Sequence, residues 1–158
     1  MKSLQLDIFK AYGSDWALVT AGTPDGYNTM TVSWGGLGTL WGKSVATVYV
    51  RPNRHTFGYL ENSEYFTVSF YPEEYRADLK TLGTLSGRDG DKVAKTKLTP
   101  KAAGESVTFE QAKCTLLCRK LYAQDLDPAA VPEKVMQTFY ASEPVHRMYI
   151  GEVVEIWN

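Results

Sequence analysis

The chain has 158 residues with a formal charge of −1, of which 44 % are hydrophobic and 22 % charged. This length suits a single domain over residues 1–158, and the composition excludes wholesale disorder. The nearly neutral balance gives no general attraction to nucleic acid or to an anionic membrane, so any bound anion must meet a local cluster of cations. Ten Tyr, six Phe and four Trp favour β-structure and the walls of a pocket for a flat ligand.

Signals for export or membrane insertion are missing from the sequence. Asp7 lies where a signal peptide needs an unbroken apolar run, and no window approaches transmembrane length. Cys114 and Cys118 are the only cysteines, and residues four apart on a strand lie about 13 Å apart, which is too far for a disulfide. We expect a cytoplasmic protein with two buried thiols and no membrane contact.

Strands dominate the first half of the chain. Alternating apolar residues predict four of them, over residues 15–21, 28–34, 45–50 and 65–71. Pro24-Asp25-Gly26 supplies the turn between the first two. Residues 35–44 are expected to form a glycine-rich loop, and 54–64 to contain a short helix with Thr56 near its first turn.

The second half mixes helices and strands. Residues 72–87 predict a helix, because apolar side chains recur there at helical spacing, and Gly87 is the expected stop. A short charged helix or turn should follow over 89–98. The remaining elements are two strand-like halves within 107–126, a Pro-bounded helix over 132–141 and a strand over 147–157.

The order of these elements predicts the fold class. Strands outnumber helices, and no regular strand–helix–strand alternation appears, which argues against a doubly wound parallel sheet. We therefore predict a mainly β protein, an antiparallel closed or partly closed barrel with flanking helices.

The second strand has an unusual distribution of polar groups. Its alternation turns one apolar face inward, formed by Met30, Val32 and Trp34. The other face carries three hydroxyl groups, on Thr29, Thr31 and Ser33. A glycine pair at 35–36 then leaves the backbone bare, so this strand is a candidate ligand contact.

Several familiar motifs are absent. The G-x-G at Gly36–Gly38 has Trp41 where a dinucleotide fingerprint needs its third glycine, and a strand follows instead of a helix. His55 and His146 are the only histidines and are too scattered for a metal site. Serines and aspartates leave room for a Ser-His-Asp arrangement, but no G-x-S-x-G elbow supports hydrolysis.

Two cationic loops predict an anion site. The sequence RPNRHT, residues 51–56, follows a strand end and begins a predicted helix, where arginine forks and free N–H groups suit phosphate. The alternative is a solvated strand end with arginine chains lying over aromatic rings. SGRDGDK, residues 86–92, adds Arg88 and Lys92, although alone it is typical of an ordinary helix-to-loop turn. Together the two loops favour phosphate binding.

The combination of residues 28–56, 86–92 and 146–157 resembles the flavin reductase-like family of FMN-binding split-barrel proteins, the group that includes flavoredoxin. The resemblance extends over about 16–157. It implies a six-stranded antiparallel Greek-key split barrel with flanking helices, assembled as a homodimer with FMN near the subunit interface.

The resemblance also implies a set of FMN-binding residues. The second strand would line the isoalloxazine through Asn28, Met30, Thr31, Ser33 and Trp34, whose hydroxyls and backbone suit a flat, hydrogen-bonding ring. The phosphate would lie within the segment formed by Arg51, Pro52, Arg54, His55 and Thr56. Ser86, Gly87, Arg88 and Lys92 would close the site, and the segment with His146 and Tyr149 would approach the open face of the flavin.

Two functions are compatible with this resemblance. The first is a flavin reductase-like oxidoreductase, in which NAD(P)H passes hydride to the flavin, which then reduces free flavin or a protein acceptor. The second is a non-enzymatic, flavoredoxin-like FMN electron carrier that a redox protein reduces. The cofactor carries the chemistry in both, so no catalytic acid, base or nucleophile is assigned.

Overall fold

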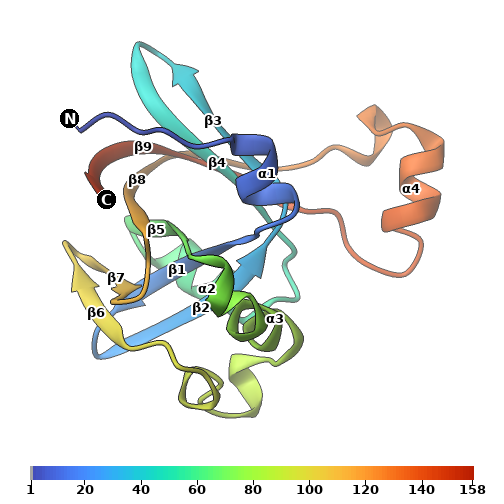
Figure 1. The fold of residues 1–158 in the computed structure, drawn as a ribbon. Coiled ribbons are helices and arrows are strands. Elements are labelled where there is room, and N and C mark those ends of the chain that lie inside the picture. Colours follow the sequence, from blue (N-terminus) through green and yellow to red (C-terminus); the bar gives the residue numbers. More distant parts are fainter. Residues whose placement is uncertain (1) are drawn as a thin grey trace.

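The computed structural model describes residues 2–158 and centres on one curled antiparallel sheet (Figure 1). Its seven strands lie in the order β2-β1-β5-β8-β9-β4-β3. They are β1 Ala17–Thr23, β2 Gly26–Val32, β3 Gly35–Leu40, β4 Lys43–Val50, β5 Tyr65–Phe70, β8 Cys114–Asp125 and β9 Arg147–Trp157. A separate hairpin consists of β6 Pro100–Ala103 and β7 Ser106–Phe109.

The sheet curls because its two edge strands are consecutive in the chain. β2 and β3 lie at opposite edges, yet only Ser33 and Trp34 separate them. The three Cα–Cα steps from Val32 to Gly35 span at most about 11 Å, so the two edges must approach each other at that end. No ladder joins β2 to β3 within residues 2–158, which leaves a split barrel. The predicted fold class is confirmed, with seven strands in the main sheet instead of six.

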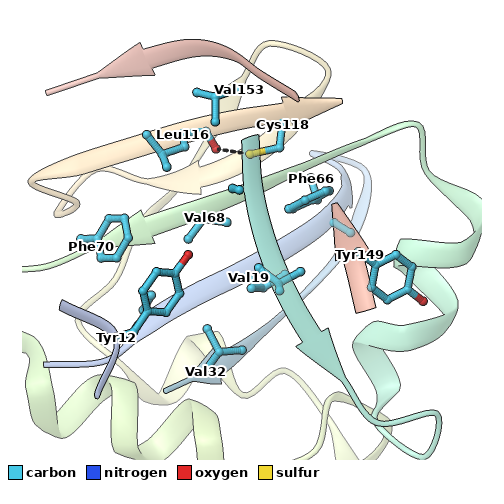
Figure 2. Close-up of a cluster of buried hydrophobic side chains, with 14 of the residues drawn as sticks. Tyr12, Val19, Val32, Phe66, Val68, Phe70, Leu116, Cys118, Tyr149 and Val153 are labelled. Carbon is cyan, nitrogen blue, oxygen red and sulfur yellow. Dashed lines mark hydrogen bonds between the residues drawn. The ribbon is translucent and has the colours of Figure 1, made fainter. Parts of the chain in front are cut away.

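The barrel interior holds the main hydrophobic core (Figure 2). Val19, Phe66 and Leu116 are fully buried there, on three neighbouring strands of the sheet. Tyr12 closes one end, with its ring edge-on to Phe70 at a centroid distance of 5.5 Å. Val32 is buried in the same cluster and Met30 packs against it, as predicted for the inward face of the second strand. The prediction is wrong for Trp34, because β2 ends at Val32 and Trp34 is 42% exposed.

A second apolar cluster lies on the other side of β1. Leu18 is fully buried in it, one residue before Val19 in the barrel core, because successive side chains of a strand point to opposite faces. Leu79 and Leu82 of helix α3 (Arg76–Thr84) pack into the same cluster with Phe109 of β7. β1 is therefore buried on both faces, which makes it a rigid support for its edge partner β2.

In the described part of the chain, four α-helices lie outside the barrel. They are α1 Ile8–Gly13, α2 His55–Asn62, α3 Arg76–Thr84 and α4 Glu133–Phe139. The 3-10 turns are η1 Glu73–Tyr75, η2 Gly87–Asp89, η3 Val93–Lys95 and η4 Pro128–Ala130. Figure 1 shows α4 on an arm, residues 126–146 between β8 and β9, that projects away from the barrel. No residue of α4 is buried. Within 2–158, no helix has the length and apolar character needed to cross a membrane.

The predicted glycine-rich loop over 35–44 is wrong. Residues 35–40 form β3, which pairs along its whole length with β4. Trp41 and Gly42 both have positive φ, 52° and 72°, which gives the two-residue turn whose twist suits a hairpin. Glycine is required at position 35 for a packing reason, since a Cβ there would lie 2.6 Å from the Tyr12 ring.

Other boundaries follow the prediction more closely. The predicted strand over 147–157 coincides with β9, and the helices within 54–64 and 132–141 are confirmed as α2 and α4. Gly87 is not the stop of α3, which ends at Thr84. Both cysteines are buried and free, as expected.

Candidate functional site

A cavity of about 380 Å³ opens beside the exposed edge of β2, which lies within the size range of small-molecule sites. The β4–α2 connection and the segment after α3 form its other walls. Its lining residues are Asn28, Met30, Thr31, Arg51, Asn53, Arg54, His55, Thr56, Leu82, Gly83, Thr84, Leu85, Ser86, Gly87, Arg88, Lys92 and Glu143. Four parts of the chain that are distant in sequence therefore meet at one site: β2, the β4–α2 connection with the start of α2, the end of α3 with the segment after it, and Glu143.

Most of the residues predicted from sequence gather at this cavity. Those that line it are Asn28, Met30, Thr31, Arg51, Arg54, His55, Thr56, Ser86, Gly87, Arg88 and Lys92. Ser33, Trp34 and Pro52 do not line it. Ser33 and Trp34 follow the end of β2 and border a separate apolar depression that includes Phe9 and Tyr49.

Sequence reasoning missed several lining residues. They are Asn53, Leu82, Gly83, Thr84, Leu85 and Glu143. Asn53 lies inside the RPNRHT segment and could have been included with it. Glu143 carried no signal, because it comes from the arm, where its carboxylate accepts a hydrogen bond from Asn53 Nδ2 at 2.7 Å.

The threonine hydroxyls of β2 are bound within the protein. Thr29 is buried, 2.8 Å from the hydroxyl of Thr20 on β1. Thr31 donates to the carbonyl of Leu79, because α3 packs on this face of β2. The expectation is therefore wrong for Thr29, which does not line the cavity, whereas Thr31 lines the cavity with its hydroxyl proton engaged by Leu79. The backbone of β2 is different, since within residues 2–158 the strand pairs only with β1 and its outer edge keeps unpaired N–H and C=O groups.

The two arginines of RPNRHT have different surroundings. The Arg51 guanidinium donates to the carbonyls of Phe139 at 3.2 Å and Pro144 at 2.9 Å, which ties the arm to the barrel. Arg54 is the exposed N-cap of α2, and its guanidinium makes no hydrogen bond within residues 2–158. Arg54 is thus the more available cation for a ligand.

A three-way contact joins the walls of the cavity. Asn28 Nδ2 of β2 donates to Thr56 Oγ1 in the first turn of α2 at 2.7 Å. Gly87 of η2 packs directly against this pair, since a Cβ there would lie 2.2 Å from Asn28 Oδ1 and 2.9 Å from the His55 ring. Glycine at 87 therefore keeps the cavity wall from colliding with the β2–α2 contact.

Lys92 is a buried cation in the cavity wall. Its ammonium donates to the carbonyls of Leu82 at 3.0 Å and Leu85 at 3.2 Å, at the carboxyl end of α3. Burial is the main cause, and repulsion from Arg54 the smaller one, that lowers the pKa of Lys92 to about 8. The lining set contains four cationic side chains, Arg51, Arg54, Arg88 and Lys92, against the single carboxylate of Glu143. The cavity therefore favours an anion.

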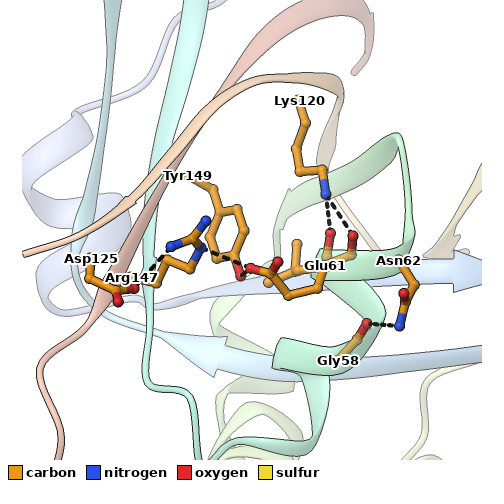
Figure 3. A network of polar contacts seen from close by, with 8 residues as sticks. Gly58, Glu61, Asn62, Lys120, Asp125, Arg147 and Tyr149 are labelled. Carbon is orange, nitrogen blue, oxygen red and sulfur yellow. Dashed lines mark hydrogen bonds and ion pairs between the residues drawn. The ribbon is translucent and has the colours of Figure 1, made fainter.

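The predicted contacts from the carboxy-terminal strand lie elsewhere. Tyr149 is fully buried in the barrel core, and its hydroxyl donates to Glu61 Oε1 at 2.6 Å. Figure 3 shows Arg147 beside the same carboxylate and Lys120 at the carboxyl end of α2. This network anchors the far end of α2. His146 is also buried, 2.7 Å from the Tyr140 hydroxyl, and burial lowers its pKa to about 4.

A family model matches the sequence of the chain, and several solved structures match its fold. The family model described as a flavin reductase like domain matches residues 9–158. The FMN-binding protein of Thermus thermophilus with bound p-hydroxybenzaldehyde superposes with a TM-score of 0.73 at 20% identity, covering 100% of this chain and 82% of that chain. Flavoredoxin of Desulfovibrio vulgaris (Miyazaki F) gives 0.70 at 20% identity, with 99% and 75% covered.

A third solved structure has the same fold. The Streptomyces globisporus NADH:FAD oxidoreductase, in complex with NAD and FAD fragments, gives a TM-score of 0.69 at 14% identity, covering 91% of this chain and 74% of that chain. No curated protein matches the sequence. At these identities the solved structures establish the fold alone.

Proposed function

Because the chain belongs to the flavin reductase-like domain family, we propose that it is an oxidoreductase that binds FMN in the cavity beside β2. The observation that carries the proposal is the charge of this cavity. Four cationic side chains and one carboxylate surround it, although the whole chain has a net charge of −1. A phosphate group satisfies such a cluster.

The cavity offers different groups to the two ends of FMN. Arg54, Arg88 and Lys92 would hold the phosphate, with the backbone N–H groups at the start of α2. The open edge of β2, between Asn28 and Thr31, would supply donors and acceptors in a fixed row to the ring. Gly87 leaves the space that any side chain would fill. When bound, FMN supplies the electron-transfer chemistry, and these residues position it.

The first expected result is that the purified protein is yellow and releases FMN on denaturation. A single cationic cluster, without a second glycine-rich pyrophosphate loop, favours FMN over FAD as the resident flavin. The measurement is the flavin absorption spectrum, with chromatography of the released cofactor. Colourless protein that fails to quench flavin fluorescence during titration with FMN would contradict the proposed function.

A reduced nicotinamide is the proposed electron donor, and hydride transfer to FMN is the proposed step. Anaerobic stopped-flow mixing of the FMN-loaded protein with NADH or NADPH should bleach the flavin absorption. The flavoredoxin fold neighbour motivates the second candidate, an electron carrier that a redox protein reduces. Bleaching by a reducing protein partner, with no bleaching by either nicotinamide, would select the carrier function.

We also propose a homodimer, because large apolar side chains remain uncovered. Phe9 is 93% exposed and Trp34 is 42% exposed. Both line the apolar depression beside the connection between β2 and β3. Trp34 also packs edge-on to Phe139 of the arm at 5.2 Å. A second copy would cover this surface.

Sedimentation should therefore give a two-chain species, and Phe9→Lys should shift it toward the monomer. Val154→Lys is the matched control, since Val154 is exposed and lies outside that depression. A wild-type monomer that still binds FMN tightly would rule out a dimer requirement.

A further inference from the structure

Another hollow lies under the β3–β4 hairpin, between residues 37–45, the segment 2–4 and the ends of β8 and β9. We call it the hairpin cleft. Figure 1 shows the hairpin extending beyond the rest of the sheet, and Lys2 and Leu4 form the facing wall of the cleft. Its volume of about 420 Å³ lies within the range of small-molecule sites, which often occupy the mouths of β-barrels. The cleft shares no lining residue with the proposed FMN cavity.

The hairpin cleft opens onto the barrel core. Three of its lining residues belong to the main core cluster, and two more pack against that cluster. The wall opposite the hairpin is held in place, because Asn158 Nδ2 donates to the Ser3 carbonyl at 3.2 Å. An apolar chain in the cleft would therefore be removed from water against existing core side chains. The apolar lining residues are Leu4, Leu37, Val45, Leu116, Val153 and Ile156.

The polar groups of the cleft are few and of one kind. Thr39 and Ser44 face each other across the hairpin, two positions beyond the inward-facing pair of Leu37 and Ala46. Both are exposed, and within residues 2–158 neither hydroxyl has a hydrogen-bond partner. Lys2 is the one charged residue among the described lining residues, so no carboxylate opposes its ammonium there. Two free hydroxyls and an ammonium suit a carboxylate ligand.

We propose that the hairpin cleft binds a monocarboxylate with an unbranched apolar chain, such as a medium-chain fatty acid. The chain lies against Leu116, Val153 and Ile156. The carboxylate lies toward Thr39, Ser44 and Lys2. The charge of the lining favours this occupant over a neutral hydrocarbon or a cation. The site goes beyond the proposed FMN function and does not depend on it.

Two variants separate the apolar and the charged parts of the cleft. Ser44→Phe should fill the cleft with a ring, because Ser44 lines it and no hydrogen bond of its hydroxyl is lost. Val154→Phe is the matched control, since Val154 is 39% exposed on β9 and does not line the cleft. Lys2→Gln removes the charge at the exposed wall. Lys134→Gln is its control, because Lys134 is exposed on α4, outside the cleft.

The probes are octanoate and octanol, titrated calorimetrically into the whole protein. We expect saturable binding of one octanoate per chain, with an affinity that rises about fourfold for each methylene group added from hexanoate to octanoate. Ser44→Phe should weaken both probes about tenfold or more, which is the loss expected when the ring excludes two methylene groups. Lys2→Gln should weaken octanoate about two- to fivefold and leave octanol unchanged, because an exposed ion pair contributes little. Both controls should match the wild type.

Three results would overturn the proposal. The first is an octanoate affinity that is equal in wild type and Ser44→Phe, which would place the ligand elsewhere. The second is equal affinity for octanoate and octanol with no effect of Lys2→Gln, which would remove the carboxylate from the site. The third is wild-type protein that binds neither probe, with a sedimentation coefficient that changes in Ser44→Phe, which would assign the cleft to a second copy. Lys2→Gln changes only the surface, so the test holds even where Ser44→Phe disturbs the hairpin.

Discussion

Arg54→Ala should weaken FMN binding about ten- to hundredfold and leave riboflavin affinity nearly unchanged, because a charge-assisted contact to phosphate contributes roughly 1.5–3 kcal/mol. Arg54 lines the cavity at the start of α2, and its guanidinium has no hydrogen-bond partner within residues 2–158. Its side chain can therefore turn to the phosphate without breaking an existing contact. Riboflavin has the same ring and no phosphate, so the ratio of the two affinities isolates this interaction.

Two further variants sharpen the comparison. Arg54→Lys should recover only part of the loss, because an ammonium keeps the charge but lacks the planar fork. Arg51→Ala should weaken FMN and riboflavin alike, since the Arg51 guanidinium is engaged by carbonyls of the arm and acts by holding it. Fluorescence quenching titrations measure all of these affinities. An unchanged FMN-to-riboflavin ratio in Arg54→Ala would assign the phosphate to Arg88 and Lys92.

The fold could be predicted from sequence wherever a strand buries one face. β9 follows an alternating pattern and was located within its observed limits, 147–157. β3 was missed because its glycines are typical of loops, and only the pairing with β4 and the packing of Tyr12 onto Gly35 explain them. α1 was also missed, since six residues capped by Asp7 give too short a periodic pattern.

The residue types of the site could be predicted from the sequence, but their arrangement in space could not. The two cationic segments were found because arginine, lysine and glycine are concentrated in them, and the fold brings them to one cavity. Whether a polar side chain is free to bind a ligand depends on its tertiary contacts. Thr29 and Arg51 look available in the sequence, yet a neighbouring strand engages the first and the arm engages the second. Glu143 joins the cavity only because the arm returns to the barrel there.

The affinity for FMN should depend on pH through Lys92. Burial lowers the pKa of this ammonium to about 8, and a phosphate dianion nearby would raise it again by stabilising the charged form. FMN binding above pH 8 must then be accompanied by proton uptake at Lys92. We expect affinity to be constant from about pH 7 to 8 and to fall above pH 8 by up to about tenfold per pH unit, until the pKa of the complex is reached.

Lys92→Met tests the assignment, because methionine keeps a long apolar stem and removes the charge. The variant should bind FMN more weakly at neutral pH, and its FMN affinity should not fall above pH 8. Riboflavin is the control, and its affinity should show no Lys92-dependent fall in either protein.

The stability of the FMN-free protein gives a second readout. In that protein the pKa of Lys92, about 8, lies below its ordinary value of 10.5, so the unfolded chain holds the proton more tightly and stability rises with pH between these values. That rise should vanish in Lys92→Met. A wild-type FMN affinity that is equal at about pH 7.5 and 9.5 would remove Lys92 from the phosphate site.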